Sequence, residues 1–265
     1  MSTATMERFS VSRTLHLARW NTVLLVRNRL ALSYALVFPL VPLPMLLLGD
    51  RGSSTLGISA IGGVLLLAGL FPVFYNVLSQ FVSRRDELVL KRMRTGETKD
   101  GELLAGIALP GILCALLTCA VAVPIAIAGG QMVPVNILLF ALGAVLATVM
   151  FAAFAYWTAA WTRSAEAAQL TSLPVIVLAS VGPFVGGLPA LSENVREAIS
   201  LTPGAAMTEL VRVGWFGFDG FEATTSTLSF AETWGLAGQP LLVMLVWTVI
   251  ALDLARRSMR WEPRA

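Results

Sequence analysis

The side chains best suited to contact a soluble partner are concentrated in one segment, residues 83–102. Long apolar runs flank this segment, and charges are costly inside a bilayer, so we expect it to lie in water. Within it, residues 86–93 predict a helix with apolar residues at helical spacing between charged ones. Such a helix can lay an apolar face on a partner while its charges steer docking. The alternative is a solvated loop whose charges only enforce membrane topology.

The sequence lacks the residue patterns of nucleotide binding, metal binding and nucleophilic catalysis. Its only lysines, Lys91 and Lys99, do not follow a glycine, so no phosphate-binding loop of the GxxxxGK[ST] type exists. The one histidine, His16, has no clustered carboxylate or thiol with which to share a metal. Cys114 and Cys119 lie five apart in an apolar run and point in different directions on a helix. We therefore expect no catalytic, cofactor-binding or metal-binding residue in this chain.

The composition indicates a protein that crosses a membrane several times. Hydrophobic residues make up 56% of the chain and charged residues 13%, with a mean hydropathy of +0.76. A soluble domain typically carries about 25% charged residues. The net charge of +3 does not indicate nucleic-acid binding, because the positive charge follows membrane topology and forms no single basic face.

Six apolar runs are long enough to cross a bilayer core of about 30 Å. The second run spans about 42 Å as a helix, so it must tilt, kink at Pro72 or project into water. The expected fold is therefore all-α, a single membrane domain over residues 1–265 with six transmembrane helices. The expected spans are 30–48, 55–82, 103–128, 134–161, 167–186 and 236–255.

Two further segments are expected to be helical without crossing the membrane. Residues 8–29 mix arginines with Leu, Val and Trp, which suits a helix lying in the headgroup layer, although this could also be the frayed start of the first span. Residues 187–237 predict a short outer or re-entrant hairpin before the last span. Its second helix begins with Thr202 as N-cap and Pro203 at the first position, and we expect it to stop at Gly214.

The distribution of Lys and Arg predicts the orientation. Sixteen of these residues lie in the N-terminal region, the 83–102 segment, the 162–166 turn and the C-terminal tail, and three lie on the opposite side. By the positive-inside rule, both termini and the 83–102 segment are cytoplasmic. We expect a multi-pass protein of the plasma membrane.

Few side chains inside the spans could couple transport to an ion gradient. Ion-coupled transporters usually place carboxylates, His or broken-helix polar motifs at mid-membrane. Here Glu166 and Asp253 lie near the cytoplasmic boundary, and Asn76, Gln80 and Asn136 are more typical of helix–helix hydrogen bonds. The chain therefore needs an outside source of energy or has a structural role.

The 83–102 segment resembles the first cytoplasmic loop of ABC-2 type transporter permeases. The similarity lies in Arg-Arg-Asp at 84–86, Leu-Lys-Arg-Met-Arg-Thr at 90–95 and Glu-Leu-Leu-Ala-Gly at 102–106. The later Leu-Thr-Pro at 201–203, with Glu and Arg downstream, is similar to the segment before that family's last helix. The resemblance covers nearly the whole chain. One departure is Thr-Gly-Glu at 95–97, where many members have Thr-Pro-Leu.

The resemblance implies a permease subunit of a bacterial ATP-binding-cassette (ABC) exporter. The loop would be a coupling helix seated in a groove of a separate ATPase, which binds the ATP and Mg²⁺. A second permease chain, identical or not, would complete the pathway, and the 187–237 hairpin would form the outer gate. The coupling residues implied are Arg84, Arg85, Asp86, Glu87, Leu90, Lys91, Met93, Arg94 and Thr95, and the gate residues are Thr202, Pro203, Glu209 and Arg212.

The apolar interior favours a hydrophobic or amphipathic substrate such as a drug, lipid or peptide over a small ion. Candidate pathway residues are aromatic, although such residues also serve as packing residues or interfacial belts. A rival reading is a membrane signalling or immunity protein that transports nothing and docks a partner through 83–102; a secondary transporter is disfavoured by the apolar spans. The candidate aromatics are Phe71, Phe74, Tyr75, Tyr156, Trp157 and Trp161.

Overall fold

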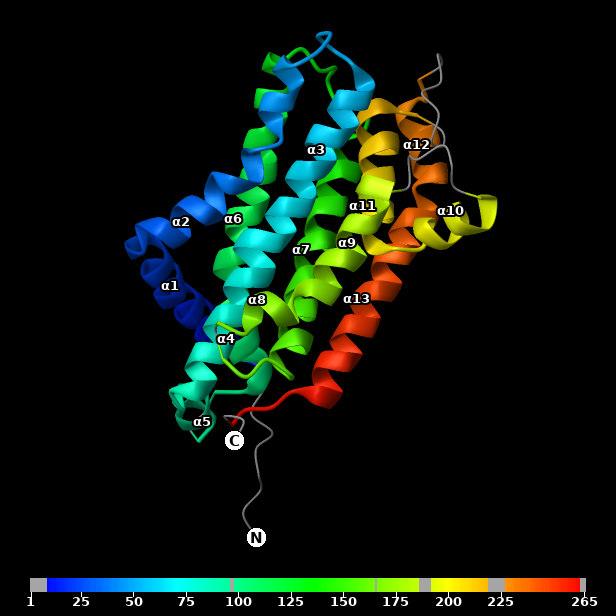
Figure 1. Ribbon diagram of the computed structural model, residues 1–265. Coiled ribbons are helices and arrows are strands. Elements are labelled where there is room, and N and C mark those ends of the chain that lie inside the picture. Colours follow the sequence, from blue (N-terminus) through cyan, green and yellow to red (C-terminus); the bar gives the residue numbers. More distant parts are fainter. Residues whose placement is uncertain (1–8, 96–97, 165, 186–191, 219–226, 263–265) are drawn as a thin grey trace.

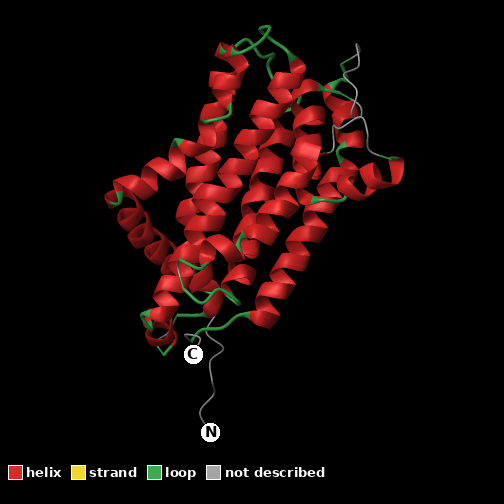
Figure 2. Cartoon of the chain, in the orientation of Figure 1, coloured by secondary structure: helices red, strands yellow, loops and turns green. Residues whose placement is uncertain are grey.

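The chain forms a helical bundle whose long helices run side by side (Figure 1). The computed structural model describes residues 9–95, 98–164, 166–185, 192–218 and 227–262. Within these residues every regular element is a helix, which confirms the all-α, polytopic prediction (Figure 2). α5 and the described residues after α13 lie at one end of the bundle, which we call the basic end (Figure 1).

The elements follow the order of the predicted spans, with interruptions. The first half comprises α1 (Val11–Arg27), α2 (Arg29–Leu36), η1 (Phe38–Leu40), η2 (Leu43–Leu47), α3 (Ser54–Ala68), η3 (Gly69–Tyr75), α4 (Asn76–Asp86) and α5 (Val89–Arg94). The second half comprises α6 (Asp100–Ala128), α7 (Ile137–Ala159), α8 (Ala168–Thr171), α9 (Leu173–Val185), α10 (Glu193–Ser200), α11 (Pro203–Val211), η4 (Arg212–Phe216), α12 (Phe230–Leu236) and α13 (Gly238–Ser258).

Five of the six predicted spans are long, apolar helical stretches among the described residues. The exception is the predicted span 167–186, which divides into α8 and the 13-residue α9. Ser172 ends α8, and Pro174 lies in the first turn of α9, where its missing N–H leaves no helical bond unmade. At 1.5 Å per residue α9 is about 20 Å long, shorter than a bilayer core of about 30 Å. The five long stretches are Arg29–Leu47, Ser54–Asp86, Asp100–Ala128, Ile137–Ala159 and Gly238–Ser258.

Prolines break the first span and bend the second. After α2, Pro39, Pro42 and Pro44 cannot donate α-helical hydrogen bonds, and the chain continues as the short 3₁₀ turns η1 and η2. In the second span Pro72 lies inside η3, a π-helical stretch between α3 and α4. The whole span has 33 residues and is about 50 Å long, so α4 projects beyond the apolar core of a bilayer.

The segment before the last span contains the two expected short helices, α10 and α11, and a third one, α12, directly before α13. Of these, α11 enters the bundle. Thr202 accepts a hydrogen bond from the Ala205 amide at 3.3 Å, as expected of an N-cap. α11 packs against α3, α9 and α13. The predicted stop at Gly214 is wrong, because η4 continues the helix to Phe216 and ends at Gly217, which has a φ of +66°. Gly217 favours this left-handed conformation, whereas Gly214 lies inside the π-helical η4 against Leu139.

Candidate functional site

The predicted coupling helix at 86–93 is two helices with a break between them. α4 ends at Asp86, and α5 begins at Val89. Leu88 between them has φ 61° and ψ 12°, the only positive φ of a non-glycine residue in the described chain. The prediction of one continuous helix over 86–93 is therefore wrong. The left-handed residue interrupts the helix, and α5 lies beyond the end of α4 at one corner of the basic end (Figure 1).

The break also changes which leucine can meet a partner. Leu90 is 0% exposed and belongs to the core of the bundle, and Met93 packs partly against that core. Leu88 is 41% exposed at the tip of the loop. The sequence pattern could not identify Leu88, because a left-handed leucine lies outside any helical periodicity. The exposed residues of the loop are Asp86, Glu87, Leu88, Lys91, Arg92 and Thr95, and the Arg94 side chain and residues 96–97 lie outside the described part.

Arg85 points into the protein and fixes the end of α4 to the end of α7. Its side chain is fully buried. Its guanidinium donates to the carbonyl oxygens of Ala159 at 2.8 Å and Thr162 at 2.7 Å. It also donates to the Asp86 carboxylate at 3.3 Å. A cation at a helix C-terminus satisfies carbonyls that have no helical partner and interacts favourably with the helix dipole. Arg85 is therefore a positioning residue between α4 and α7 and does not face a partner.

Arg84 connects three helices through amide side chains. It donates to Asn21 Oδ1 of α1 at 2.5 Å and to Gln80 Oε1 of α4 at 3.1 Å. Asn21 in turn donates to the carbonyl oxygen of Gly106 in α6 at 2.7 Å. The start of the 83–102 segment is thus joined to α1 and α6 by hydrogen bonds among buried or half-buried groups.

Glu102 fixes the other end of the 83–102 segment, a role that was not predicted from the sequence. Its buried carboxylate accepts two hydrogen bonds from Arg13 at 2.9 Å each and one from the Ser10 amide at 2.6 Å. It also accepts from the Lys99 amide at 3.2 Å, so it caps the start of α6. An acidic residue three positions into a helix is a known capping signal, which could have indicated part of this role. The bidentate pair joins the beginning of α1 to the beginning of α6.

The aromatic residues predicted to line a pathway do not form one surface. Phe71 and Tyr75 of η3 continue a row of rings that begins with Tyr34 and Phe38 of the first span. Successive ring centroids are 5.9, 4.4 and 5.7 Å apart. Tyr75 also shares a 3.1 Å hydrogen bond with Ser172, between α8 and α9. We call these four rings the aromatic ladder. Tyr34 and Phe38 were not predicted to belong to this site, because the sequence of one span does not show which other span its aromatic residues face.

The remaining predicted aromatics lie elsewhere. Phe74 is buried in the core, and the buried Tyr156 donates a 2.6 Å hydrogen bond to the Leu104 carbonyl oxygen. Trp157 lies beside Trp161, with ring centroids 4.4 Å apart, and beside Phe154 at 6.2 Å. In this chain these residues pack α7 against its neighbours.

The predicted gate residues occupy the helix that enters the bundle. Thr202 and Pro203 start α11, and their contacts are those of a helix N-terminus. Glu209 and Arg212 lie one turn apart, and the Glu209 carboxylate attracts the largely buried Arg212 guanidinium. A paired charge beside apolar spans favours a specific local geometry.

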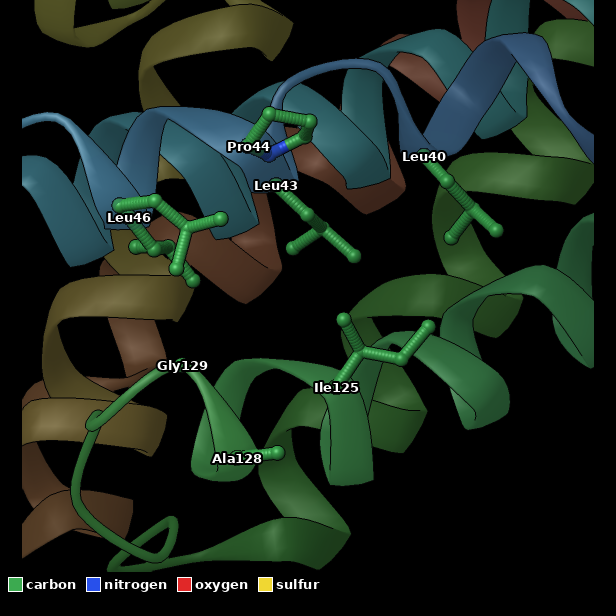
Figure 3. A pocket seen from close by; sticks show the side chains of 8 residues that line it. Leu40, Leu43, Pro44, Leu46, Ile125, Ala128 and Gly129 are labelled. Carbon is green, nitrogen blue, oxygen red and sulfur yellow. The ribbon is translucent and has the colours of Figure 1, made fainter.

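Two apolar grooves flank the half of α6 away from the basic end. One has a volume of about 390 Å³ and lies between η1–η2 and the end of α6. In Figure 3 the side chains of Leu43 and Leu46 face Ile125 and Ala128 across it. The other, about 520 Å³, lies between α6 and α7 and is lined by residues that include Cys119, Phe140 and Ala144. Both are lined by apolar residues, so an occupant has to be a hydrocarbon group.

Comparison with known proteins identifies the family. No curated protein matches this chain. A model of the ABC-2 family transporter proteins matches residues 37–255, which run from the start of η1 to most of α13 and include the 83–102 segment. With its multi-pass, all-helical fold, the chain belongs to the ABC-2 family of transporter membrane proteins.

Proposed function

We propose that this chain is the permease subunit of an ABC exporter and that a separate ATPase docks on residues 83–102, which we call the coupling loop. The observation that carries the proposal is the geometry of that loop. α5 lies at the basic end with the exposed Leu88 directly before it, while Arg84, Arg85 and Glu102 fix the two flanks of the loop to α1, α6 and α7. An exposed element that is fixed to α1, α4, α6 and α7 is suited to transmit a movement of its partner to these helices.

The coupling loop is also connected directly to helices that cross the membrane. α4 is the projecting end of the 33-residue second span, so displacement of α5 moves this helix and, through Arg85, the end of α7. The π-helical η3 lies farther along the same span and carries two rings of the aromatic ladder. Single π-helical turns are frequent at functional sites. Movement at the basic end would therefore reach the ladder.

The surface around the ladder is the proposed face toward a second permease chain. Tyr34 and Phe38 are exposed there, and Phe71 and Tyr75 are half-buried. The rings offer apolar faces and two hydroxyls, which suits an amphipathic drug, lipid or peptide. The α10–α11 hairpin would gate the outer side. In this proposal the substrate moves outward, and ATP with Mg²⁺ binds to the ATPase.

A second function remains a candidate because the loop would serve it equally well. A signalling or immunity protein could use the same exposed loop to dock a cytoplasmic partner without transport. The aromatic ladder favours the permease, since a docking protein has no need for a row of rings shared by two spans.

The test is purification of the full chain from its native host in detergent, with mass spectrometry of stoichiometric partners. We expect an ATPase with a phosphate-binding loop, and we expect ATP hydrolysis by the complex in lipid vesicles. The matched variants are Leu88→Asp, which should release the ATPase, and Leu48→Asp, which changes an exposed leucine at the other end and should retain it. Leu90→Asp is unsuitable, because it would place a charge in the core.

A chain that purifies without any ATPase, under conditions that preserve a known ABC complex, would contradict the permease proposal. It would favour the signalling alternative. Retention of the ATPase by Leu88→Asp would leave the permease proposal in place and exclude Leu88 as the docking residue.

A further inference from the structure

The chain after α13 turns back beneath the bundle and reaches the coupling loop. α13 ends at Ser258, and the extended Met259 redirects the chain toward α5 (Figure 1). We call residues 259–262 the C-terminal strap. Its last member, Glu262, accepts an ion-pair hydrogen bond from Lys91 of α5, with 2.8 Å between Nζ and Oε1. Lys91 holds the pKa of the Glu262 carboxyl below its usual value.

Trp261 joins the strap to the helices that fix the loop. Its ring centroid lies 5.7 Å from that of Phe81 in α4. Phe81 is buried and makes an edge-on contact with Tyr156 of α7, with centroids 5.6 Å apart. The Tyr156 hydroxyl then donates to the Leu104 carbonyl oxygen of α6 at 2.6 Å. The strap is thus the outermost member of a series of contacts through α4, α7 and α6.

The two contacts have different physical roles. Lys91 is 58% exposed and Glu262 67% exposed, and an ion pair in water contributes little to stability. The ion pair between Lys91 and Glu262 does, however, restrict the direction in which α5 points. The half-buried indole supplies the apolar contact that holds the strap in place. Since the Lys91 ammonium is on the exposed side of α5, a protein that covers α5 must also meet Glu262.

We propose that the C-terminal strap is the second half of the ATPase-docking surface and sets the orientation of α5. The inference rests on the proposed function. The loop alone is supported on its α4 and α6 flanks, whereas the strap supports the exposed side of α5 itself. The composite surface offers Leu88 as an apolar knob and Lys91, Arg92 and Arg260 as exposed cations. Such a surface fits a groove with an apolar pocket and an acidic rim.

The experiment uses the full-length chain and the ATPase identified by native purification, prepared separately. We expect Trp261→Ala to weaken their association roughly tenfold, as loss of a positioned aromatic contact would do. Trp261→Phe should restore most of the affinity. Trp234→Ala is the matched control, because Trp234 is a partly exposed tryptophan at the opposite end and should leave binding unchanged.

Glu262→Lys tests the strap without touching the core. It places a second cation beside Lys91, so residue 262 should move away from Lys91 and the direction of α5 should no longer be restricted, while the thermal midpoint of the bundle stays unchanged. If Trp261→Ala fails to fold, Glu262→Lys decides the question alone. Unchanged ATPase affinity in Glu262→Lys, with the wild-type chain binding normally, overturns the inference. Absence of binding by the wild-type chain would instead count against the proposed function.

A chemical cross-link separates a supporting strap from one that must move away. Lys91→Cys and Glu262→Cys in one chain can be joined by a short bis-maleimide reagent, while Cys114 and Cys119 lie within α6 in the bilayer segment. We expect the cross-linked chain to bind the ATPase and support ATP hydrolysis at least as well as the uncross-linked chain. Loss of binding after cross-linking would show that the strap covers the site, and would overturn the inference.

Discussion

At the scale of single residues, Arg85 and Leu88 have opposite roles although they are three positions apart. Arg85 is buried and satisfies carbonyl oxygens at the end of α7, so it determines where the loop lies. Leu88 is exposed and left-handed, so it presents an apolar side chain at the loop's tip. Backbone conformations of this kind cost about 1 kcal/mol and persist where the surroundings impose them, often at functional sites.

Arg85→Ala should destabilise the bundle. The carbonyl oxygens of Ala159 and Thr162 would lose their donor in a buried site, at a cost of roughly 2–4 kcal/mol. Thermal unfolding in detergent measures the effect. Arg85→Lys provides the control, because one ammonium keeps the charge but lacks the planar fork, and it should lie between wild type and Arg85→Ala. An unchanged midpoint for Arg85→Ala would contradict the positioning role.

Leu88→Gly should separate stability from docking. Glycine adopts positive φ without steric cost, which relieves about 1 kcal/mol of strain, partly offset by its greater freedom in the unfolded chain. The thermal midpoint should therefore stay equal or rise, while ATPase affinity falls because the apolar knob is gone. Leu88→Met keeps an apolar side chain of similar size and should keep the affinity. A fall in both stability and affinity for Leu88→Gly would mean that the leucine packs against its own chain.

At the scale of elements, the close crossing of α6 and the second span depends on a glycine, Gly111, which has no side chain. A Cβ atom at Gly111 would lie 2.0 Å from the carbonyl oxygen of Pro72 in the π-helical η3. Backbone atoms cannot yield as a flexible side chain does. Close approach at this crossing brings α6 against the irregular part of the second span, next to the aromatic ladder.

Gly111→Ala should force α6 away from η3 and lower the thermal midpoint by several degrees, equivalent to roughly 1–3 kcal/mol of overpacking. Gly62→Ala is the matched control in a neighbouring helix, because its added Cβ would meet only Thr208 Oγ1 at 3.9 Å. Alanine favours helix over glycine, so the control should be neutral or stabilising. Equal midpoints for the two variants would contradict the close crossing.

At the scale of the whole molecule, the distribution of charge predicts which end faces the cytoplasm. The basic end carries α5, the 162–166 turn and the C-terminal strap, and sixteen of the nineteen Lys and Arg residues were assigned to that side. By the positive-inside rule we expect this end to face the cytoplasm, where a soluble ATPase could reach the loop.

Labelling with a membrane-impermeant maleimide tests this orientation. Asp50→Cys lies at the opposite end and should react in intact cells. Thr95→Cys is exposed at the basic end and should react only after permeabilisation. The parental chain, whose two cysteines lie within α6, gives the background. The reverse pattern would invert the topology and remove the loop from the cytoplasm.

The sequence by itself determined the class of this protein. Runs of apolar residues, low charge and the Lys and Arg asymmetry predicted a multi-pass helical protein with a charged loop between its second and third spans. Those features are local or additive, because membrane partitioning depends on the composition of each segment. Capping signals at Thr202 and Pro203 likewise predicted where α11 begins.

The tertiary structure decided which side of each helix meets which neighbour. The predicted coupling helix placed Leu90 among the residues that contact a partner. In the structure the helix is interrupted at the left-handed Leu88, so Leu90 is buried in the core and Leu88 is exposed instead. Tyr34 and Phe38 joined Phe71 and Tyr75, and Trp261 reached Phe81, only because distant segments fold together. When a span is apolar on all its faces, its composition does not show which face contacts which neighbouring helix. Only the packing of the folded chain determines these contacts.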